Sequence, residues 1–225
     1  MKINKPTALI VSLLSTSFAF ANTSADFSNS KLHYSGFEIG YGSNDFDVGV
    51  KYSNAFNRDW SLLAAYNSDD NFDAHKFKLD FQNRDGMGVA LNYHHYQDYR
   101  SEGFSANVFE FDLYNRSEMY KNLSLIPQVS VGSLKHKGMK DYVYYTAASV
   151  DMSYKITPEV WVGVTPEYTY SLGKVKEKNG LKYKLRDWDY TANIGYQINQ
   201  SSALVYSYQY GEGDHLSLFS FKHTF

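Results

Sequence analysis

Residues 77–93, FKLDFQNRDGMGVALNY, carry the pattern that decides the fold. Apolar and polar residues alternate over the first six positions, so an extended strand here has one apolar and one polar face. A three-residue loop at 84–86 places Phe81 opposite Val89 and keeps the apolar residues on one face, whereas a two-residue loop would mix the faces. Gly86 supplies the left-handed residue that ends such a loop. The stretch therefore predicts a β-hairpin.

The same two-residue period continues from residue 36 to the C-terminus. Stretches such as 108–114 and 188–198 alternate in the same way, and no stretch carries a convincing 3.6-residue helical pattern. The pattern predicts an all-β fold of about twelve antiparallel strands, or ten if 36–53 form one bent strand or an unpaired lead. The predicted strands cover 36–42, 45–53, 60–68, 75–83, 87–96, 107–116, 123–132, 142–155, 160–172, 188–198, 203–211 and 215–225.

The connections between these strands alternate in length. Short turns are predicted at 54–59, 84–86, 119–122, 156–159 and 199–202, and longer polar loops at 69–74, 97–106, 133–141 and 173–187. Short turns at one end and long loops at the other are typical of up-and-down barrels that cross the bacterial outer membrane. A soluble β-sandwich gives no reason for this alternation. We therefore predict a transmembrane β-barrel over residues 36–225.

Two prolines interrupt the predicted strands. Pro127 and Pro166 fall inside the seventh and ninth segments. A proline has no N–H to donate to a neighbouring strand, and a closed barrel has no free edge on which to place it. The sequence therefore predicts a bulge or a strand end at each proline.

The first 21 residues differ in kind from the rest. Lys2 and Lys5 precede a mostly apolar run, and residues 18–21 end in the A-x-A pattern that signal peptidase recognises. A membrane-anchoring helix is the alternative, but polar residues interrupt the run and no stop-transfer charges follow it. We expect residues 1–21 to be a cleaved signal peptide and residues 22–35 to be a short lead before the barrel.

The composition narrows the class of protein further. Twenty-two basic and 24 acidic side chains make nucleic acid an unsuitable partner, and the absence of cysteine excludes a disulfide scaffold. The mean hydropathy is −0.47, and no later run reaches the ~18 apolar residues of a membrane helix. The 21 tyrosines and 15 phenylalanines suit strands that meet a membrane interface, although a tyrosine-rich soluble β-sandwich is the alternative.

The C-terminal segment 218–225, LFSFKHTF, resembles the last strand of bacterial outer-membrane barrels. In that family, alternating apolar residues that end in a C-terminal aromatic form the signal read by the outer-membrane assembly machinery. The resemblance assigns this role to Phe219, Phe221 and Phe225, with His223 departing from the alternation. Twelve strands and this length are similar to small monomeric porins for acidic oligosaccharides, which have arginine-rich lumens, whereas this chain has five arginines.

The parity of the alternation assigns each strand residue to one face. The predicted lipid-facing band includes Phe77, Leu79, Phe81, Val89, Leu91, Phe109, Phe111, Leu113, Val162, Val164, Ile194 and Tyr206. The predicted lumen-lining residues are Glu38, Asp47, Lys51, Lys76, Lys78, Asp80, Glu110, Asp112, Arg116, Asp151, Lys155, Glu167, Asp189 and Lys222. Acids and bases are nearly balanced in this lining, which predicts weak and slightly cationic ion selectivity.

Two of the outer loops are rich in lysine. Loop 173–187 carries Lys174, Lys176, Lys178, Lys182, Lys184 and Arg186 against Glu177 and Asp187, and the neighbouring loop adds Lys135, Lys137 and Lys140. Contact with the phosphates of lipopolysaccharide is one interpretation of this charge. An ordinary solvated loop is the other.

Catalytic and metal sites have weaker signals. Asp73 with His75 and Asp214 with His215 lie at predicted rim positions, where an Asp–His pair can activate water, but neither pair has a convincing third member. Adjacent strand residues point to opposite faces, so His94 faces the lumen, His95 faces the lipid interface, and the two cannot chelate one ion. We expect no catalytic residue, metal or cofactor.

These observations predict a monomeric outer-membrane barrel that acts as a narrow, porin-like channel for passive diffusion of small polar solutes. The expected partners are outer-membrane lipid and lipopolysaccharide, the assembly machinery and the solutes, with no nucleic acid. The alternatives are a structural or adhesive barrel with a plugged lumen, and a barrel hydrolase that uses Asp73, His75, Asp214 or His215.

Mass spectrometry of protein extracted from membranes tests the predicted export. The charged start, apolar run and A-x-A end predict a mature chain that begins at Asn22. A chain that still begins near Met1 would contradict the prediction of a cleaved signal peptide.

Overall fold

The structure is a computed structural model that describes residues 25–43, 45–97, 104–120, 122–211 and 214–225, so the predicted signal peptide lies outside the described residues. The long strands are β1 Gly36–Gly42, β2 Asp45–Ala55, β3 Trp60–Asp69, β4 Ala74–Asn83, β5 Met87–Tyr96, β6 Ala106–Asn115, β8 Leu123–His136, β9 Val143–Lys155, β10 Val160–Ser171, β13 Arg186–Asn199, β14 Ser202–Gly211 and β15 Asp214–Thr224. The shorter elements are η1 Asp70–Phe72, β7 Ser117–Tyr120, β11 Val175–Lys176 and β12 Lys182–Tyr183. Within the described ranges, no helix is long and apolar enough to cross a membrane.

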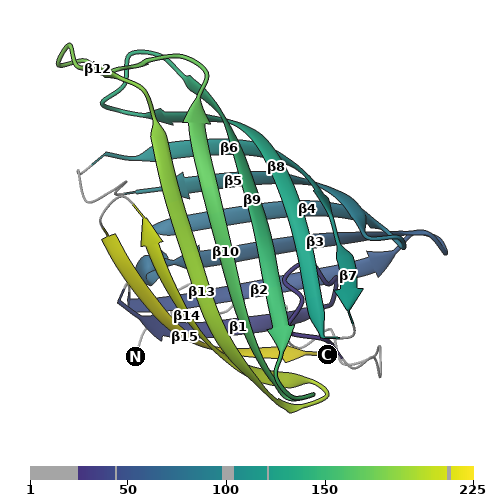
Figure 1. Cartoon of the computed structure of the whole chain (residues 1–225). Coiled ribbons are helices and arrows are strands. Elements are labelled where there is room, and N and C mark those ends of the chain that lie inside the picture. Colours follow the sequence, from purple (N-terminus) through teal and green to yellow (C-terminus); the bar gives the residue numbers. More distant parts are fainter. Residues whose placement is uncertain (1–24, 44, 98–103, 121, 212–213) are drawn as a thin grey trace.

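The twelve long strands close into an antiparallel barrel. Each long strand pairs with the next along the chain, and β1 pairs with β15 from Gly36↔Thr224 to Gly42↔Leu218, which joins the two ends of the sheet (Figure 1). The predicted twelve-stranded all-β barrel is confirmed. The ten-stranded alternative is wrong, because β1 and β2 are separate strands that pair with each other along the whole of β1.

The hairpin of β4 and β5 has the register predicted from its sequence. Phe81 pairs with Val89 and Leu79 with Leu91, and Gly86 has a φ of 94° at the end of the loop. Leu91 is 52% exposed on the outer face, whereas the Asp80 residue on the inner face is 1% exposed. The ladders give the whole predicted lipid-facing band the same outward parity.

Pro127 and Pro166 lie inside strands, and the predicted bulge or strand end at each of them is wrong. The pairing of β10 with β9 skips residues 165–166, which include Pro166, and resumes in an unchanged register. On one side, β8 pairs with β6 up to Gln128 and with β7 from Leu125 onward, so residues 126–127, which include Pro127, have no partner there. The register is the same on both sides of this gap. No bulge and no strand end is needed at either position, because a local gap in the ladder on one side accommodates the missing donor.

The loop end of the barrel carries a lid, which we define as residues 137–141 and 173–185. The backbone joins its two parts, since Lys140 N donates to Lys176 O at 2.9 Å and Lys178 N donates to Gly138 O at 2.8 Å. Met139 and Val175 are buried against inward residues of β8 and β9, which fixes the lid over that side of the mouth. The β11–β12 hairpin projects beyond the barrel wall (Figure 1).

At the opposite end, the described part of the N-terminal lead enters the barrel instead of lying outside it. Residues 25–35, named the inner lead below, contact inward side chains of most of the wall, from β2 round to β14. Ser35 O accepts a hydrogen bond from the backbone N of Phe225 at 3.2 Å, which ties this segment to the end of β15. The sequence alone gave no sign that the lead would occupy the lumen.

The outward face predicts a specific cost for a charge at Leu91. Leu91 lies between Leu79 and Phe111 on the neighbouring strands, so Leu91→Arg would hold a guanidinium in hydrocarbon. We expect a loss of ~2–4 kcal/mol in the free energy of unfolding near mid-membrane, measured by denaturant unfolding in lipid vesicles. Leu91→Ala controls for the lost apolar area, and equal stability of the two variants would place Leu91 outside the hydrocarbon.

Candidate functional site

The inner face of the barrel gathers nearly all the residues predicted to line the lumen. The ladders give inward parity to Glu38, Asp47, Lys51, Lys76, Lys78, Asp80, Glu110, Asp112, Asp151, Lys155, Glu167, Asp189 and Lys222. Arg116 is different, because it follows the end of β6 and its backbone N bonds to Gly86 O at the turn end. Arg116 is therefore a rim residue and not part of the strand lining.

One half of the lumen wall holds its charges in pairs. Lys222 Nζ lies 3.3 Å from Glu38 Oε1, Lys78 Nζ lies 2.8 Å from Asp80 Oδ2, and Lys76 forms an ion pair with Asp69. These residues come from β15, β1, β3 and β4, which are near neighbours in the sheet. Charges inside a barrel must be hydrated or paired, so this half contributes little net charge to the lumen.

The other half carries an excess of carboxylates, which we call the acidic arc: Glu110, Asp112, Asp151, Glu167 and Asp189. These residues lie on β6, β9, β10 and β13, across the barrel from the paired half. The strands β6, β8, β9, β10 and β13 are fully described, and the only Lys or Arg at an inward position on them is Lys155 at the rim. The lumen is therefore electrically asymmetric.

Neutral donors supply the first contacts of the acidic arc. Tyr145 Oη donates to Glu110 Oε2 at 2.9 Å, and Asp112 accepts from Ser130 Oγ at 2.8 Å and from Asn92 Nδ2 at 2.9 Å. Such bonds orient the carboxyl groups. The contacts of Glu110 and Asp112 within the wall are therefore made by uncharged side chains and not by Lys or Arg.

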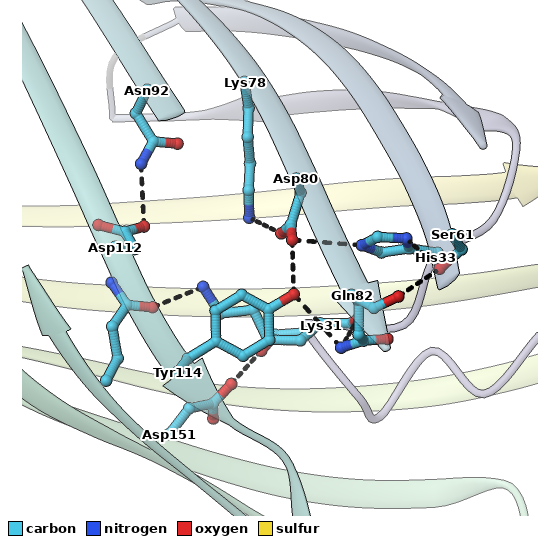
Figure 2. A network of polar contacts seen from close by, with 12 residues as sticks. Lys31, His33, Ser61, Lys78, Asp80, Gln82, Asn92, Asp112, Tyr114 and Asp151 are labelled. Atoms are coloured by element: carbon cyan, nitrogen blue, oxygen red, sulfur yellow. Dashed lines mark hydrogen bonds and ion pairs between the residues drawn. The ribbon is translucent and has the colours of Figure 1, made fainter. Parts of the chain in front are cut away.

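The inner lead brings its own basic groups into this space (Figure 2). Lys31 Nζ donates to Gln128 Oε1 at 2.6 Å and lies 4.7 Å from the centre of the Tyr114 ring, and Gln82 Nε2 donates to the Lys31 carbonyl at 3.2 Å. The His33 ring lies 3.4 Å from Asp80 and its Nδ1 is 2.8 Å from Ser61 Oγ. The lead thus bridges the paired half and the acidic arc.

Apolar packing and a rim ion pair anchor the start of the inner lead. Phe27 is 6% exposed and packs in a cluster with Trp161, Ala203 and Val205. Lys155 Nζ donates to Asp26 Oδ2 at 2.6 Å. These contacts hold the lead across the turn end of the lumen and reduce its free cross-section there.

The Asp26 carboxyl is sensitive to pH. Burial alone raises its pKa, but the hydrogen bonds and positive charge from Lys155 and the bonds from Ser28 outweigh burial, so the pKa lies below its ordinary value of 3.8. A carboxyl with a depressed pKa stabilises the docked lead above pH 3.8 and loses that contribution as the pH falls through its own lower pKa.

The histidines singled out for catalysis have neutral partners. His75 Nδ1 contacts Tyr66 Oη at 3.0 Å and Ser68 Oγ at 3.4 Å, and His215 contacts Tyr208 Oη. Neither ring shares a hydrogen bond with Asp73 or Asp214 among the described residues. The residues that the sequence placed in an Asp–His arrangement are therefore not assembled into one. His94 faces the lumen and His95 faces outward, where its Nδ1 lies 2.9 Å from Asn107 Oδ1, as predicted.

Comparisons with known proteins agree with this architecture. No protein-family model and no curated protein sequence matches the chain. Among solved structures, the NanC porin has a TM-score of 0.56 at 11% identity, covering 85% of this chain and 98% of that one. The COG4313 outer membrane channel from Pseudomonas putida F1 has a TM-score of 0.56 at 6% identity, covering 89% and 99%, and the KdgM porin has 0.51 at 9% identity, covering 85% and 98%.

The fold is that of a porin-like outer-membrane barrel. For such a barrel, the short turns are periplasmic and the lid is extracellular. The inner lead then enters the lumen from the periplasmic end.

The last strand of this porin-like barrel has the outward aromatic face expected of it. Phe219 is 53% exposed, and Phe221 pairs with Ile39 on β1. His223, which departs from the apolar alternation, stacks on Phe221 and lies tilted against the Phe37 ring. Its Nδ1 is 3.0 Å from Ser202 Oγ. The histidine therefore fits the outward aromatic surface. Recognition of Phe219, Phe221 and Phe225 by the assembly machinery stays a prediction.

The rim anchor predicts acid release of the inner lead. In a Trp60→Phe/Trp188→Phe background, Trp161 is the only tryptophan left, and it packs beside Phe27. We expect its fluorescence to shift to longer wavelength as the pH falls below 3.8. Asp26→Asn should show a shift already at neutral pH, since it removes the charge. An identical pH profile in both proteins would show that Asp26 does not anchor the lead.

Proposed function

We propose that the protein forms a narrow, passive channel for small polar solutes across the bacterial outer membrane. The observation that carries this proposal is a lumen lined by charged and polar side chains, inside a wall whose outer face is apolar. Barrels of eight strands are filled and those of sixteen or more enclose wide aqueous channels. Twelve strands leave an intermediate interior that these side chains, the lid and the inner lead narrow further.

The proposed solutes carry no net charge or a positive charge. The acidic arc gives one wall a negative field, whereas the opposite wall is neutralised by its own ion pairs. Fixed charges in a narrow passage raise the local concentration of ions of opposite sign. Cations should therefore enter the lumen more readily than anions. The preference should be stronger than the weak one expected for an evenly balanced lining.

The charge of the lumen argues against a polyanionic solute. The KdgM porin has been solved in complex with disordered oligogalacturonate, which is a polymer of uronic acids. In the present chain, carboxylates of the acidic arc such as Asp112 and Asp151 would repel such a chain of carboxylates. A likeness of fold therefore does not carry that ligand over to this protein.

A plugged, structural barrel is the second candidate, and the inner lead favours it. Lys31, His33 and Phe27 are held by wall residues on several strands, so the lead is a docked part of the structure. A lumen narrowed at both ends could transmit only small solutes or none. Removing the lead distinguishes the two functions.

Planar-bilayer recording of refolded protein in a salt gradient tests the channel. We expect a small conductance and a reversal potential of the sign given by cation preference. Glu167→Gln/Asp189→Asn should reduce the cation-to-anion permeability ratio about twofold or more, because it removes two fixed charges from the arc. The matched control Asp59→Asn/Asp85→Asn removes two exposed carboxylates from periplasmic turns and should leave the ratio unchanged.

A second recording addresses the plug. Deleting residues 25–33 should raise the conductance, with circular dichroism as the check that the barrel still forms. Anion preference in the full chain would contradict the role given to the acidic arc. Absence of conductance both with and without the lead would support the structural barrel.

A further inference from the structure

The extracellular edge of β8, β9, β10 and β13 carries a group of outward-facing basic and aromatic residues. Lys135 extends the outward row of β8 and its Nζ lies 5.6 Å from the centre of the Tyr142 ring. Arg186 begins β13 opposite Tyr170, and its guanidinium lies 5.4 Å from the centre of that ring. We call Lys135, Lys184 and Arg186 the basic rim.

A backbone hydrogen bond connects the two parts of the basic rim. Leu172, which directly follows β10, donates its backbone N–H to Tyr144 O of β9 at 2.8 Å. This bond lies between the Tyr142 and Tyr170 parts of the rim. Lys184 Nζ lies 4.9 Å from the Tyr170 ring and donates to the carbonyls of Ser171 and Leu172 at 3.0 Å. The cations are thus held in fixed places over tyrosine rings. Lysine has three donors and arginine five, so each can still bind an anion.

The outward residues below the basic rim change from apolar to aromatic to basic along the strand, which is the order expected across a membrane interface. Along β13 toward the extracellular end, the outward positions are Ile194, Ala192, Tyr190, Trp188 and Arg186. The first is apolar, and Tyr190 and Trp188 are exposed aromatic residues of the kind that mark the interface in outer-membrane barrels. Arg186 lies two residues, roughly 7 Å of strand, beyond Trp188. A residue just beyond the aromatic girdle of an outer-membrane barrel is at the depth expected for the phosphates of the outer leaflet.

Among the described loops at this end, the basic charge gathers on one side of the barrel. The lid behind the basic rim carries Lys137, Lys140, Lys174, Lys176, Lys178 and Lys182 against Asp141 and Glu177. On the opposite side, the described connection between β3 and β4 contains Asp70 and Asp73 and no Lys or Arg. A loop charged only for solubility has no reason to place its cations beside the aromatic girdle of a single wall.

We propose that the basic rim binds the phosphate groups of lipopolysaccharide in the outer leaflet. Arginine and lysine pair with phosphate through charge-assisted hydrogen bonds, and the lipid anchor of lipopolysaccharide presents its phosphates at the depth of the rim. The acyl chains then lie along the apolar outward residues of the same strands, such as Val131, Val164 and Ile194. This binding rests on the outer-membrane location and is independent of any conduction through the lumen.

Native mass spectrometry of refolded protein in detergent tests the proposal with diphosphoryl lipid A as the probe. Monophosphoryl lipid A and phosphatidylcholine are the comparison lipids. We expect the wild type to retain diphosphoryl lipid A most strongly. Lys135→Gln/Arg186→Gln should raise its Kd by at least about tenfold, since it removes two phosphate partners. Lys184 is kept in this variant because it binds two loop carbonyls. Lys135 Nζ also donates to the Lys140 carbonyl at 2.6 Å, so Arg186→Gln alone is measured beside the double variant.

The matched control is Arg58→Gln/Arg84→Gln, which removes two exposed cations at the periplasmic end. It should bind diphosphoryl lipid A like the wild type, and heat-modified gel migration verifies that each variant is folded. Equal loss in both variants, or equal retention of phosphatidylcholine and diphosphoryl lipid A, overturns the proposal. Should the rim variant be unable to fold, Arg186→Gln alone decides, with an unchanged Kd counting against the site. Loss of lipid binding with intact conductance separates this site from the channel.

Discussion

The pairing of β1 with β15 is the constraint on which the rest of the structure depends. A membrane offers no water to bind exposed N–H and C=O groups, so a sheet can cross it only when its two edges meet. Residues Gly36 to Gly42 complete the ring by pairing with Leu218 to Thr224. Closure separates an inside from an outside, and the two-residue period of the strands then assigns every side chain to one of them.

The interior that closure creates must accommodate many charges without a dry core. One half of the wall does so by pairing, as in Lys222 with Glu38 and Lys78 with Asp80. The acidic arc instead relies on neutral donors, such as Tyr145 to Glu110 and Ser130 to Asp112. Water in an open lumen would hydrate what these donors leave exposed, so the polar lining and the proposed passage are consistent with each other.

The inner lead changes how that interior can work. A strand wall alone would leave the two halves of the lumen facing each other across solvent. Lys31 and His33 reach across this space and contact Gln128, Tyr114 and Asp80. The lead therefore contributes side chains to the lumen that no strand provides, and its anchor at Asp26 and Phe27 lies at the turn end of the barrel. The lid has a similar effect at the other end, where Met139 and Val175 pack on the inner face of the wall.

Local alternation determined most of what the sequence could predict. It gave the twelve strands, the Phe81–Val89 register and the two faces, because the side-chain period of a strand depends only on its own residues. It also gave the inward parity of residues such as Glu110 and Glu167. Only the tertiary structure decided which inward charges meet, because Lys222 and Glu38 are distant in sequence and become neighbours through closure. The path of residues 25–35 and the fold of the lid over β8 and β9 were likewise set by contacts between distant segments, for which no periodic pattern exists. The way in which each proline is accommodated was also decided by the tertiary structure. A gap in the hydrogen-bond ladder depends on the neighbouring strand and not on the proline alone.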